Sequence, residues 1–303
     1  MQRQMGFASA ADAASATGSG PRPPGAVLAR RVAAVGVAVL AVLTLAACGA
    51  DSHSDQVGPD AATRETVDPT IAEPGAPPEV SAHPEDWPLP GRDYANSRAV
   101  LDSPISRATI DRLEVAWATP LEGPGSLGNS STTPIVMGDT IFVQDLSSNI
   151  RAFDRASGDL RWERRYDESQ IGPSGVAVGW DKAFATRGSR EVVALDRGSG
   201  KELWATLLPQ TETEGISIQP QVWGDLVLAS TVPISLNGLF VGGDRGTLFA
   251  LDAETGEIEW SFDTVAGEGV WGDEINSGGG SWYPPAIDPV AGKVYWGTGN
   301  PSP

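Results

Sequence analysis

Three segments of the chain share one pattern: AFDRASGDLRW at 152–162, ALDRGSGKELW at 194–204 and ALDAETGEIEW at 250–260. Each has Asp at its third position, Ser or Thr followed by Gly at the sixth and seventh positions, and Trp at its end. Aspartate accepts hydrogen bonds from the backbone N–H groups of a turn, and glycine supplies the positive φ that a tight hairpin turn requires. Each segment therefore predicts a strand, a tight turn and a second strand that carries the tryptophan.

The spacing of the tryptophans indicates a repeating unit. Trp117 precedes the three closing tryptophans, Trp162, Trp204 and Trp260, which follow it at steps of 45, 42 and 56 residues. Steps of this size fit one four-stranded propeller blade per repeat, with an insertion in the longest step.

Strand-like runs precede the repeats, and the folded part shows no sustained helical periodicity. The runs lie at 133–143, 220–230 and 284–297, and a Gly-Asp or similar pair divides each into a hairpin. Apolar residues do not recur at i, i+3, i+4 and i+7, so we expect few helices. We predict an all-β fold, a β-propeller of four-stranded blades; the alternative is a β-sandwich with chance tryptophan spacing.

Residues 1–47 are predicted to be a lipoprotein signal peptide. A 14-residue apolar run at 32–45 follows two arginines, which is typical of a signal-peptide core and is short for a membrane-spanning helix. The run ends in Leu-Ala-Ala-Cys at 45–48, which resembles the lipobox of bacterial lipoproteins. This resemblance implies lipidation of Cys48 and a protein anchored in the cell membrane on its extracytoplasmic side. The alternative is a buried free cysteine.

Residues 48–86 are predicted to be an acidic, Pro-rich tether. They contain six prolines, many acidic residues and almost no large apolar side chains, so they cannot bury enough surface to fold.

The whole chain has a net charge of −18, and loss of residues 1–47, with four arginines and one aspartate, would make it −21. Such a surface excludes a general nucleic-acid binder and leaves the lipid anchor as the sole membrane attachment. A single cysteine excludes a disulfide framework and a cysteine-based zinc site.

The repeats resemble the tryptophan-docking motifs of the quinoprotein alcohol and methanol dehydrogenase superfamily, whose cofactor is pyrroloquinoline quinone (PQQ). The segments DWPLPGRDYANSRAV at 86–100 and ISRATIDRLEVAW at 105–117 are similar to the start of that domain. The resemblance implies that residues 87–303 are a partial PQQ-type β-propeller. It also implies that the contacts between blades depend on Trp117, Trp162, Trp204, Trp260, Asp154, Asp196, Asp252, Gly158, Gly200 and Gly256.

The propeller is expected to be incomplete. The superfamily closes its ring with eight blades, and each blade takes about 40–45 residues. Residues 87–303 number 217, which suffices for about four to five blades. We therefore expect a truncated product or fragment of a longer propeller.

The segment SWYPPAIDPVAGKVYWGTGNPSP at 281–303 resembles the family's cofactor-binding stretch. In that family PQQ lies at the propeller centre beside a calcium ion, with a tryptophan as its floor. The resemblance implies that Trp282 contacts the quinone, that Asn300 is a calcium ligand, and that Ser217 lies near the quinone-contacting hydroxyl. An indole face stacks well on a planar quinone, and an amide oxygen is a hard ligand that calcium accepts. The alternative is that Trp282 is a packing residue and Asn300 a turn residue.

Other positions depart from the family pattern. The family's calcium-binding glutamate precedes a Gly-x-Arg-Gly turn, which resembles 243–246, and Leu239, Phe240 and Val241 stand at that place instead. The family's paired cysteines and quinone-contacting arginine are absent from 172–179. The catalytic aspartate would fall beyond the last residue, so the catalytic residues of this chain are unknown. We expect PQQ and calcium to bind weakly to the residues present.

Two functions follow from these patterns. The first is a lipid-anchored, extracytoplasmic propeller related to PQQ-dependent alcohol dehydrogenases, which oxidises an alcohol or sugar; this chain would lack the catalytic base. The alternative is a non-catalytic scaffold lipoprotein that binds partner proteins. Similar repeats also build the propeller lipoprotein of the outer-membrane β-barrel assembly machinery.

Overall fold

The computed structural model divides the chain into two units, residues 1–63 and 64–303. The residues that it describes all belong to the second unit. They are 73–123, 128–170, 172–209, 211–212, 214–233, 235–236, 239–240, 245–265 and 278–299. Cys48 and Asn300, the predicted lipidation site and calcium ligand, lie outside these residues.

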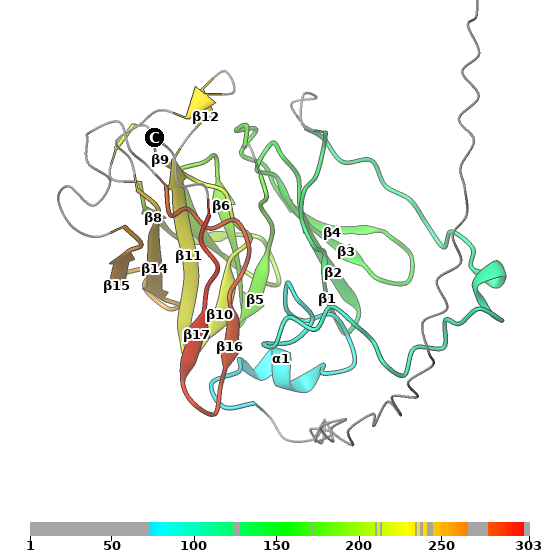
Figure 1. Cartoon of the computed structure of the whole chain (residues 1–303). Coiled ribbons are helices and arrows are strands. Elements are labelled where there is room, and N and C mark those ends of the chain that lie inside the picture. Colours follow the sequence, from blue (N-terminus) through cyan, green and yellow to red (C-terminus); the bar gives the residue numbers. More distant parts are fainter. Residues whose placement is uncertain are drawn as a thin grey trace, which may run out of the picture. The chain divides into compact units, whose positions relative to one another are not determined.

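Three antiparallel sheets follow one another along the chain, each built on four strands in sequence order, and the third has a fifth strand beside them (Figure 1). The first contains β1 (Ile135–Met137), β2 (Thr140–Gln144), β3 (Ile150–Asp154) and β4 (Leu160–Arg164). The second contains β5 (Ala177–Gly179), β6 (Lys182–Arg187), β7 (Glu191–Asp196) and β8 (Glu202–Leu207). The third contains β10 (Gln221–Trp223), β11 (Leu226–Pro233), β14 (Thr247–Asp252) and β15 (Ile258–Asp263). A two-stranded sheet of β16 (Ala286–Asp288) and β17 (Lys293–Tyr295) follows. These sheets confirm the predicted blades.

The third sheet contains the insertion that the longest tryptophan step predicted. Strand β9 (Glu214–Ile216) pairs with the far end of β11, and the hairpin of β12 (Ser235–Leu236) and β13 (Leu239–Phe240) lies between β11 and β14. In the described part of the chain, helix is confined to α1 (Pro78–Ala82) and the 3₁₀ turn η1 (Ile110–Arg112). Neither of these helices is long and apolar enough to cross a membrane.

Each sheet receives a tryptophan from the segment before it. The indole N–H donates to a backbone carbonyl in the turn of the next sheet, and the ring covers the glycine of that turn. At Gly200, an added Cβ would lie 2.5 Å from the Trp162 ring, and the φ of +69° is one that residues with side chains rarely adopt. The contacts are Trp117 with Arg155 (3.0 Å) and Gly158, Trp162 with Arg197 (2.8 Å) and Gly200, and Trp204 with Ala253 (3.3 Å) and Gly256.

The aspartate of each repeat organises the same turn. Asp252 accepts hydrogen bonds from two backbone N–H groups in its own turn, and Asp196 accepts that of Ser199. Asp154 likewise accepts hydrogen bonds from the backbone N–H groups of Ala156 and Ser157. A hydrogen bond from Arg161, together with these N–H groups, lowers the pKa of Asp154 to about 2. Because the pKa is lowered on folding, this aspartate stabilises the folded state at neutral pH and loses that effect as the pH falls from about 4 towards 2.

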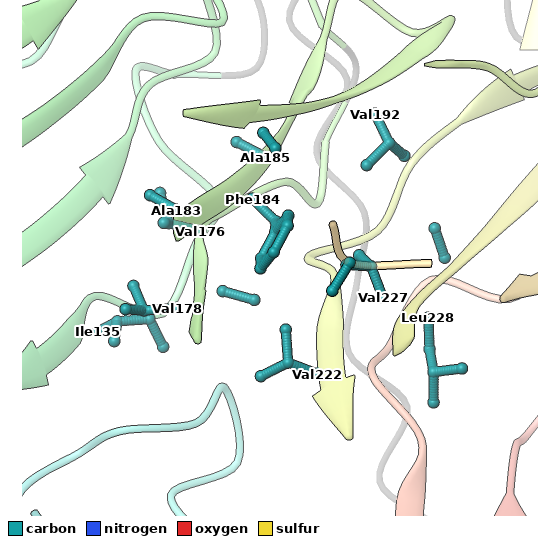
Figure 2. Close-up of a cluster of buried hydrophobic side chains, with 14 of the residues drawn as sticks. Ile135, Val176, Val178, Ala183, Phe184, Ala185, Val192, Val222, Val227 and Leu228 are labelled. Atoms are coloured by element: carbon teal, nitrogen blue, oxygen red, sulfur yellow. The ribbon is translucent and has the colours of Figure 1, made fainter. Parts of the chain in front are cut away.

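The hydrophobic core lies between consecutive sheets. Phe184 of β6 is fully buried beside Val176 and Val178, which belong to the same sheet or lead into it. Val222 and Val227 of the third sheet pack into the same cluster, as Figure 2 shows. The core therefore joins the inner strands of neighbouring blades, while the tryptophans join their outer strands.

Residues 73–86 pack against the blades, although the sequence predicted a tether as far as residue 86. Both carboxylate oxygens of Glu79 accept backbone N–H groups, from Trp180 at 2.9 Å and Asp181 at 2.6 Å. The indole of Trp223 donates to the carbonyl of Pro74 at 2.8 Å, and Val80 is buried. The folded part therefore starts no later than residue 73. The predicted end of the tether was wrong because this segment is held by hydrogen bonds to backbone groups, which do not require large apolar side chains.

Trp260 differs from the other repeat tryptophans. All six residues of β15 are exposed, and Trp260 is 39 % exposed, against 8 % for Trp162. No docking turn covers Trp260 within the described residues, so the fourth tryptophan of the series is placed on β15 but not docked.

Replacement of Gly200 by Ala tests the docking contact. Both Gly200 and Gly224 have a left-handed φ, of +69° and +61°, but a Cβ at Gly224 would meet no atom within 4 Å. We expect Gly224→Ala to lower the free energy of unfolding by about 1 kcal/mol, from backbone strain alone. Gly200→Ala should lower it by about 2–4 kcal/mol, because Trp162 must also move. Urea unfolding measures both, and equal losses would contradict the docking contact.

Candidate functional site

A cavity of about 330 Å³ is lined by loop segments that lie far apart in the sequence. Trp282 forms part of its wall. The other walls come from the residues just before β1, β5 and β10 and from residues 87–98, called the entry loop below. The lining residues are Trp87, Pro90, Gly91, Asn96, Arg98, Ser130, Ser131, Thr132, Thr133, Pro173, Gln219, Trp282, Tyr283 and Pro284.

Trp282 is half-buried and lies between two hollows. Besides the cavity, it lines a second hollow of about 280 Å³ together with Gly280, Gly297 and Gly299. A β-bridge joins Gly280 to Gly299 and holds both glycines beside the indole. A Cβ on Gly299 would lie 3.6 Å from the Trp282 ring, an ordinary van der Waals distance, so Gly299 lies next to the indole without being pressed against it. Trp282 is therefore a wall residue with space beside it rather than a fully packed core residue.

Gln219 fixes the wall of the cavity next to β1. Its side-chain oxygen accepts the Thr133 backbone N–H at 3.1 Å, and its amide group donates to the carbonyls of Thr133 and Val176 at 2.9 and 2.8 Å. Gln219 is only 4 % exposed, so these bonds satisfy a buried amide and link the segments that lead into β1, β5 and β10.

Ser217 does not line this cavity. It is 2 % exposed, and its hydroxyl donates to the carbonyl of Gly172 at 2.5 Å. The structure therefore places Ser217 near the cavity wall with its hydroxyl already engaged. Asn300, the expected calcium ligand, lies outside the described residues, directly after the bridged Gly299.

The entry loop is held against the site by two side chains. Tyr94 is buried and donates from its hydroxyl to the carbonyl of Val222 at 2.9 Å; burial raises the pKa of this hydroxyl, so it remains a donor at neutral pH. Asn96 donates from its side chain to the carbonyl of Pro284 at 3.2 Å, next to Trp282. The loop and the Trp282 segment are therefore fixed to each other, which sequence analysis missed because the two lie almost 190 residues apart.

The described residues that line the cavity include few charged side chains. Among the described lining residues there is one cation, Arg98, and no carboxylate. A hard divalent cation prefers carboxylate oxygens, so these lining residues do not form a calcium site. One group that could ligate a metal, His83 with Glu85 and Asp86, lies elsewhere in the described part of the chain. Asp86 already accepts the Gly138 N–H at 2.8 Å and pairs with Arg155 at 2.7 Å.

Comparison with known families decides the relationship. The PQQ_2 family model, described as outer membrane protein assembly factor BamB, matches residues 91–174 and 169–271, more than half of the chain. The chain belongs to this repeat family. The two matches together include all four tryptophans of the repeat series, from Trp117 to Trp260.

Two similar proteins are dehydrogenases by name. Quinohemoprotein alcohol dehydrogenase of Comamonas testosteroni is 29 % identical, over 86 % of this chain and 40 % of that protein. Polyvinylalcohol dehydrogenase of Pseudomonas sp is 30 % identical, over 74 % of this chain and 37 % of that protein. The crystal structure of the Comamonas testosteroni enzyme matches with a TM-score of 0.61 and 26 % identity, over 72 % of this chain and 36 % of that chain. The chain thus spans about two fifths or less of these relatives.

These matches confirm the resemblance to quinoprotein alcohol dehydrogenases and the β-propeller fold. They do not assign roles to single residues. Of the predicted site residues, Trp282 lies in the wall of a cavity and Ser217 lies outside its lining. Arg98 and Gln219 line the cavity although no sequence pattern singled them out, because their place depends on contacts between distant segments.

Proposed function

We propose that this chain is part of an alcohol dehydrogenase of the quinoprotein type and that its cavity binds PQQ. The observation that carries the proposal is the position of Trp282, whose indole forms a wall of a cavity in a propeller of this family. The relatives that share the fold and the repeats act on alcohols by name, which supports an alcohol as the substrate class.

The lining residues suit a flat, partly polar ligand. PQQ is a planar fused-ring quinone with several carboxylates, and Trp282 offers an aromatic face of matching shape. Ser131, Thr132 and Thr133 provide hydroxyl groups along one wall, and Arg98 provides a positive charge. Small-ligand sites commonly combine apolar walls with a few polar groups in this way.

Bound PQQ would supply the chemistry of the reaction, as the acceptor of a hydride equivalent from the alcohol carbon. Trp282 would hold the ring by stacking, and Arg98 and the hydroxyl groups of the wall would orient it. A catalytic base is not among the described lining residues, and neither is a carboxylate that would hold calcium. We therefore assign this chain a cofactor-binding role and propose that the base and the metal ligands come from elsewhere in the protein.

The scaffold alternative has less support. The family model carries the name of an assembly factor, but the two relatives with the matches reported above are both dehydrogenases. A cavity with an aromatic wall and a single cation also fits a small-molecule site better than a protein-binding surface, which would be flat and larger.

We further propose that the mature protein is lipid-anchored through Cys48 and faces the extracytoplasmic side of the cell membrane. The proposal rests on the Leu-Ala-Ala-Cys motif at 45–48 and the apolar run before it. The strongly acidic surface is compatible with this arrangement, because it would be repelled by anionic headgroups and would stay clear of the membrane.

A titration with PQQ tests cofactor binding. We expect the chain to bind PQQ with a Kd in the micromolar range, with quenching of tryptophan fluorescence after correction for absorption by the quinone. Because the described wall holds no carboxylate, calcium should change the affinity less than twofold. Trp282→Ala should abolish most of the quenching, while Trp260→Ala, on β15, should retain it. Equal quenching in both variants would contradict the placement of the ring, and no binding at millimolar PQQ would contradict the function.

Phase partitioning tests the anchor. In a bacterial host, the full chain should enter the detergent phase of a cloud-point separation, and Cys48→Ser should remain in the aqueous phase. A lipid chain contributes about 0.8 kcal/mol per buried CH₂ group, so its loss changes partitioning by a large factor. Identical aqueous partitioning of both proteins would rule out lipidation at Cys48.

A further inference from the structure

We propose that Arg98 binds a carboxylate of the planar aromatic ligand in the cavity and is its anion-recognition residue. The proposal rests on the proposed function, because it concerns the same cavity and takes PQQ as the probe. It adds a residue role that neither the repeat pattern nor the relatives assign.

Arg98 is a cation without a carboxylate partner among the described residues. Most arginines of the described blades form ion pairs, such as Arg151 with Asp145 at 2.7 Å and Arg187 with Glu202 at 3.4 Å. The Arg98 guanidinium instead lies 5.8 Å from the ring centre of Tyr283, at the cavity wall. In a protein of net charge −18, a cation left free of carboxylates beside a cavity is available to an anionic ligand.

The surroundings of Arg98 are aromatic. Trp87, Tyr283 and Trp282 line the same cavity. A guanidinium that stacks on one ring keeps its N–H groups free at its edge, where they can form a bidentate pair with a carboxylate. A flat ring that lies against Trp282 and carries a carboxylate at its edge combines both features. The chemical class of the ligand is therefore an aromatic carboxylate.

The backbone of the entry loop is strained where it presents this side chain. Arg92, Asn96 and Arg98 all have positive φ values, of 78°, 54° and 50°. Asparagine tolerates this region, but arginine has no local stabilisation there beyond the hydrogen bond from its N–H to the Gly91 carbonyl at 3.0 Å. Strain of this kind is commonly retained at binding sites, where the position of a side chain matters more than local stability.

A hydrogen bond also joins the entry loop to the segment that carries Trp282 and Tyr283. Asn96 donates to the Pro284 carbonyl at 3.2 Å, and Pro284 follows Tyr283 and Trp282 in the sequence. This hydrogen bond ties the backbone that carries Arg98 to the backbone that carries the aromatic wall, while the Arg98 side chain itself is exposed and can reach a carboxylate at the cavity mouth. Fixing the two backbones before the ligand binds reduces the entropic cost of binding.

Calorimetric titration of PQQ into the full chain tests the proposal with three variants. Arg98→Asn removes the charge with a residue that accepts a left-handed backbone, and it should weaken binding about 5- to 10-fold at low salt. Arg98→Lys keeps the charge without the planar fork and should lie between the two. Both arginines are exposed, but Arg107 lies outside the cavity lining, so Arg107→Asn removes the same charge and should match the wild type.

Salt and thermal stability provide the second readout. Added salt should weaken PQQ binding to the wild type more than to Arg98→Asn, because the ion pair is screened. The melting temperature of Arg98→Asn should equal or exceed that of the wild type, because the left-handed strain is relieved.

The outcomes separate the two proposals. If the wild type and Arg98→Asn bind PQQ equally, or if Arg107→Asn weakens binding as much as Arg98→Asn, the role of Arg98 is overturned while the proposed function stands. If the wild type binds no PQQ at millimolar concentration, the proposed function is overturned and the role of Arg98 with it. A lower melting temperature of Arg98→Asn, with weaker binding, would assign Arg98 to the structure of the loop and overturn its role as a ligand residue.

Discussion

The contact between a tryptophan and the glycine of the next blade's turn is the interaction on which the rest of the structure depends. It occurs three times in the described chain, with an indole hydrogen bond to the turn in each case. Two independent reasons favour glycine at this position: its φ is positive, and a Cβ would overlap the tryptophan ring. The contacts of Trp162 and Trp204 each join two sheets, and Trp117 joins the segment before β1 to the first sheet; the sheets in turn set the position of the loops that line the cavity.

Much of the fold could be predicted because the repeat carries its own local chemistry. Asp154 and Gly158 belong to one turn, so a short sequence segment predicts that turn. The interval from Trp117 to Trp162 predicts the length of one blade. The packing of residues 73–86 could not be predicted in this way. The indole of Trp223 donates to the backbone carbonyl of Pro74, almost 150 residues away in the sequence. Every residue has a backbone carbonyl, so the amino-acid sequence does not show which carbonyl the indole will bind.

The candidate site was predictable only in part, for the same physical reason. Trp282 stood out through its resemblance to a family motif, and it does form a cavity wall. Arg98 and Gln219 reach that cavity through long-range packing of the entry loop and of β9–β11 respectively, which no local pattern encodes. Ser217 followed the family pattern, but its hydroxyl bonds to Gly172 and it does not line the cavity.

The most direct test of the docking account compares two tryptophans at the same place in the repeat. Trp162 is docked on the next blade and 8 % exposed, whereas Trp260 is 39 % exposed on β15. The account predicts that Trp162→Ala lowers the free energy of unfolding in urea by about 3–5 kcal/mol, and Trp260→Ala by about 1 kcal/mol. Equal losses for the two variants would contradict the claim that docking onto the neighbouring turn, rather than burial within its own sheet, makes the tryptophan stabilising.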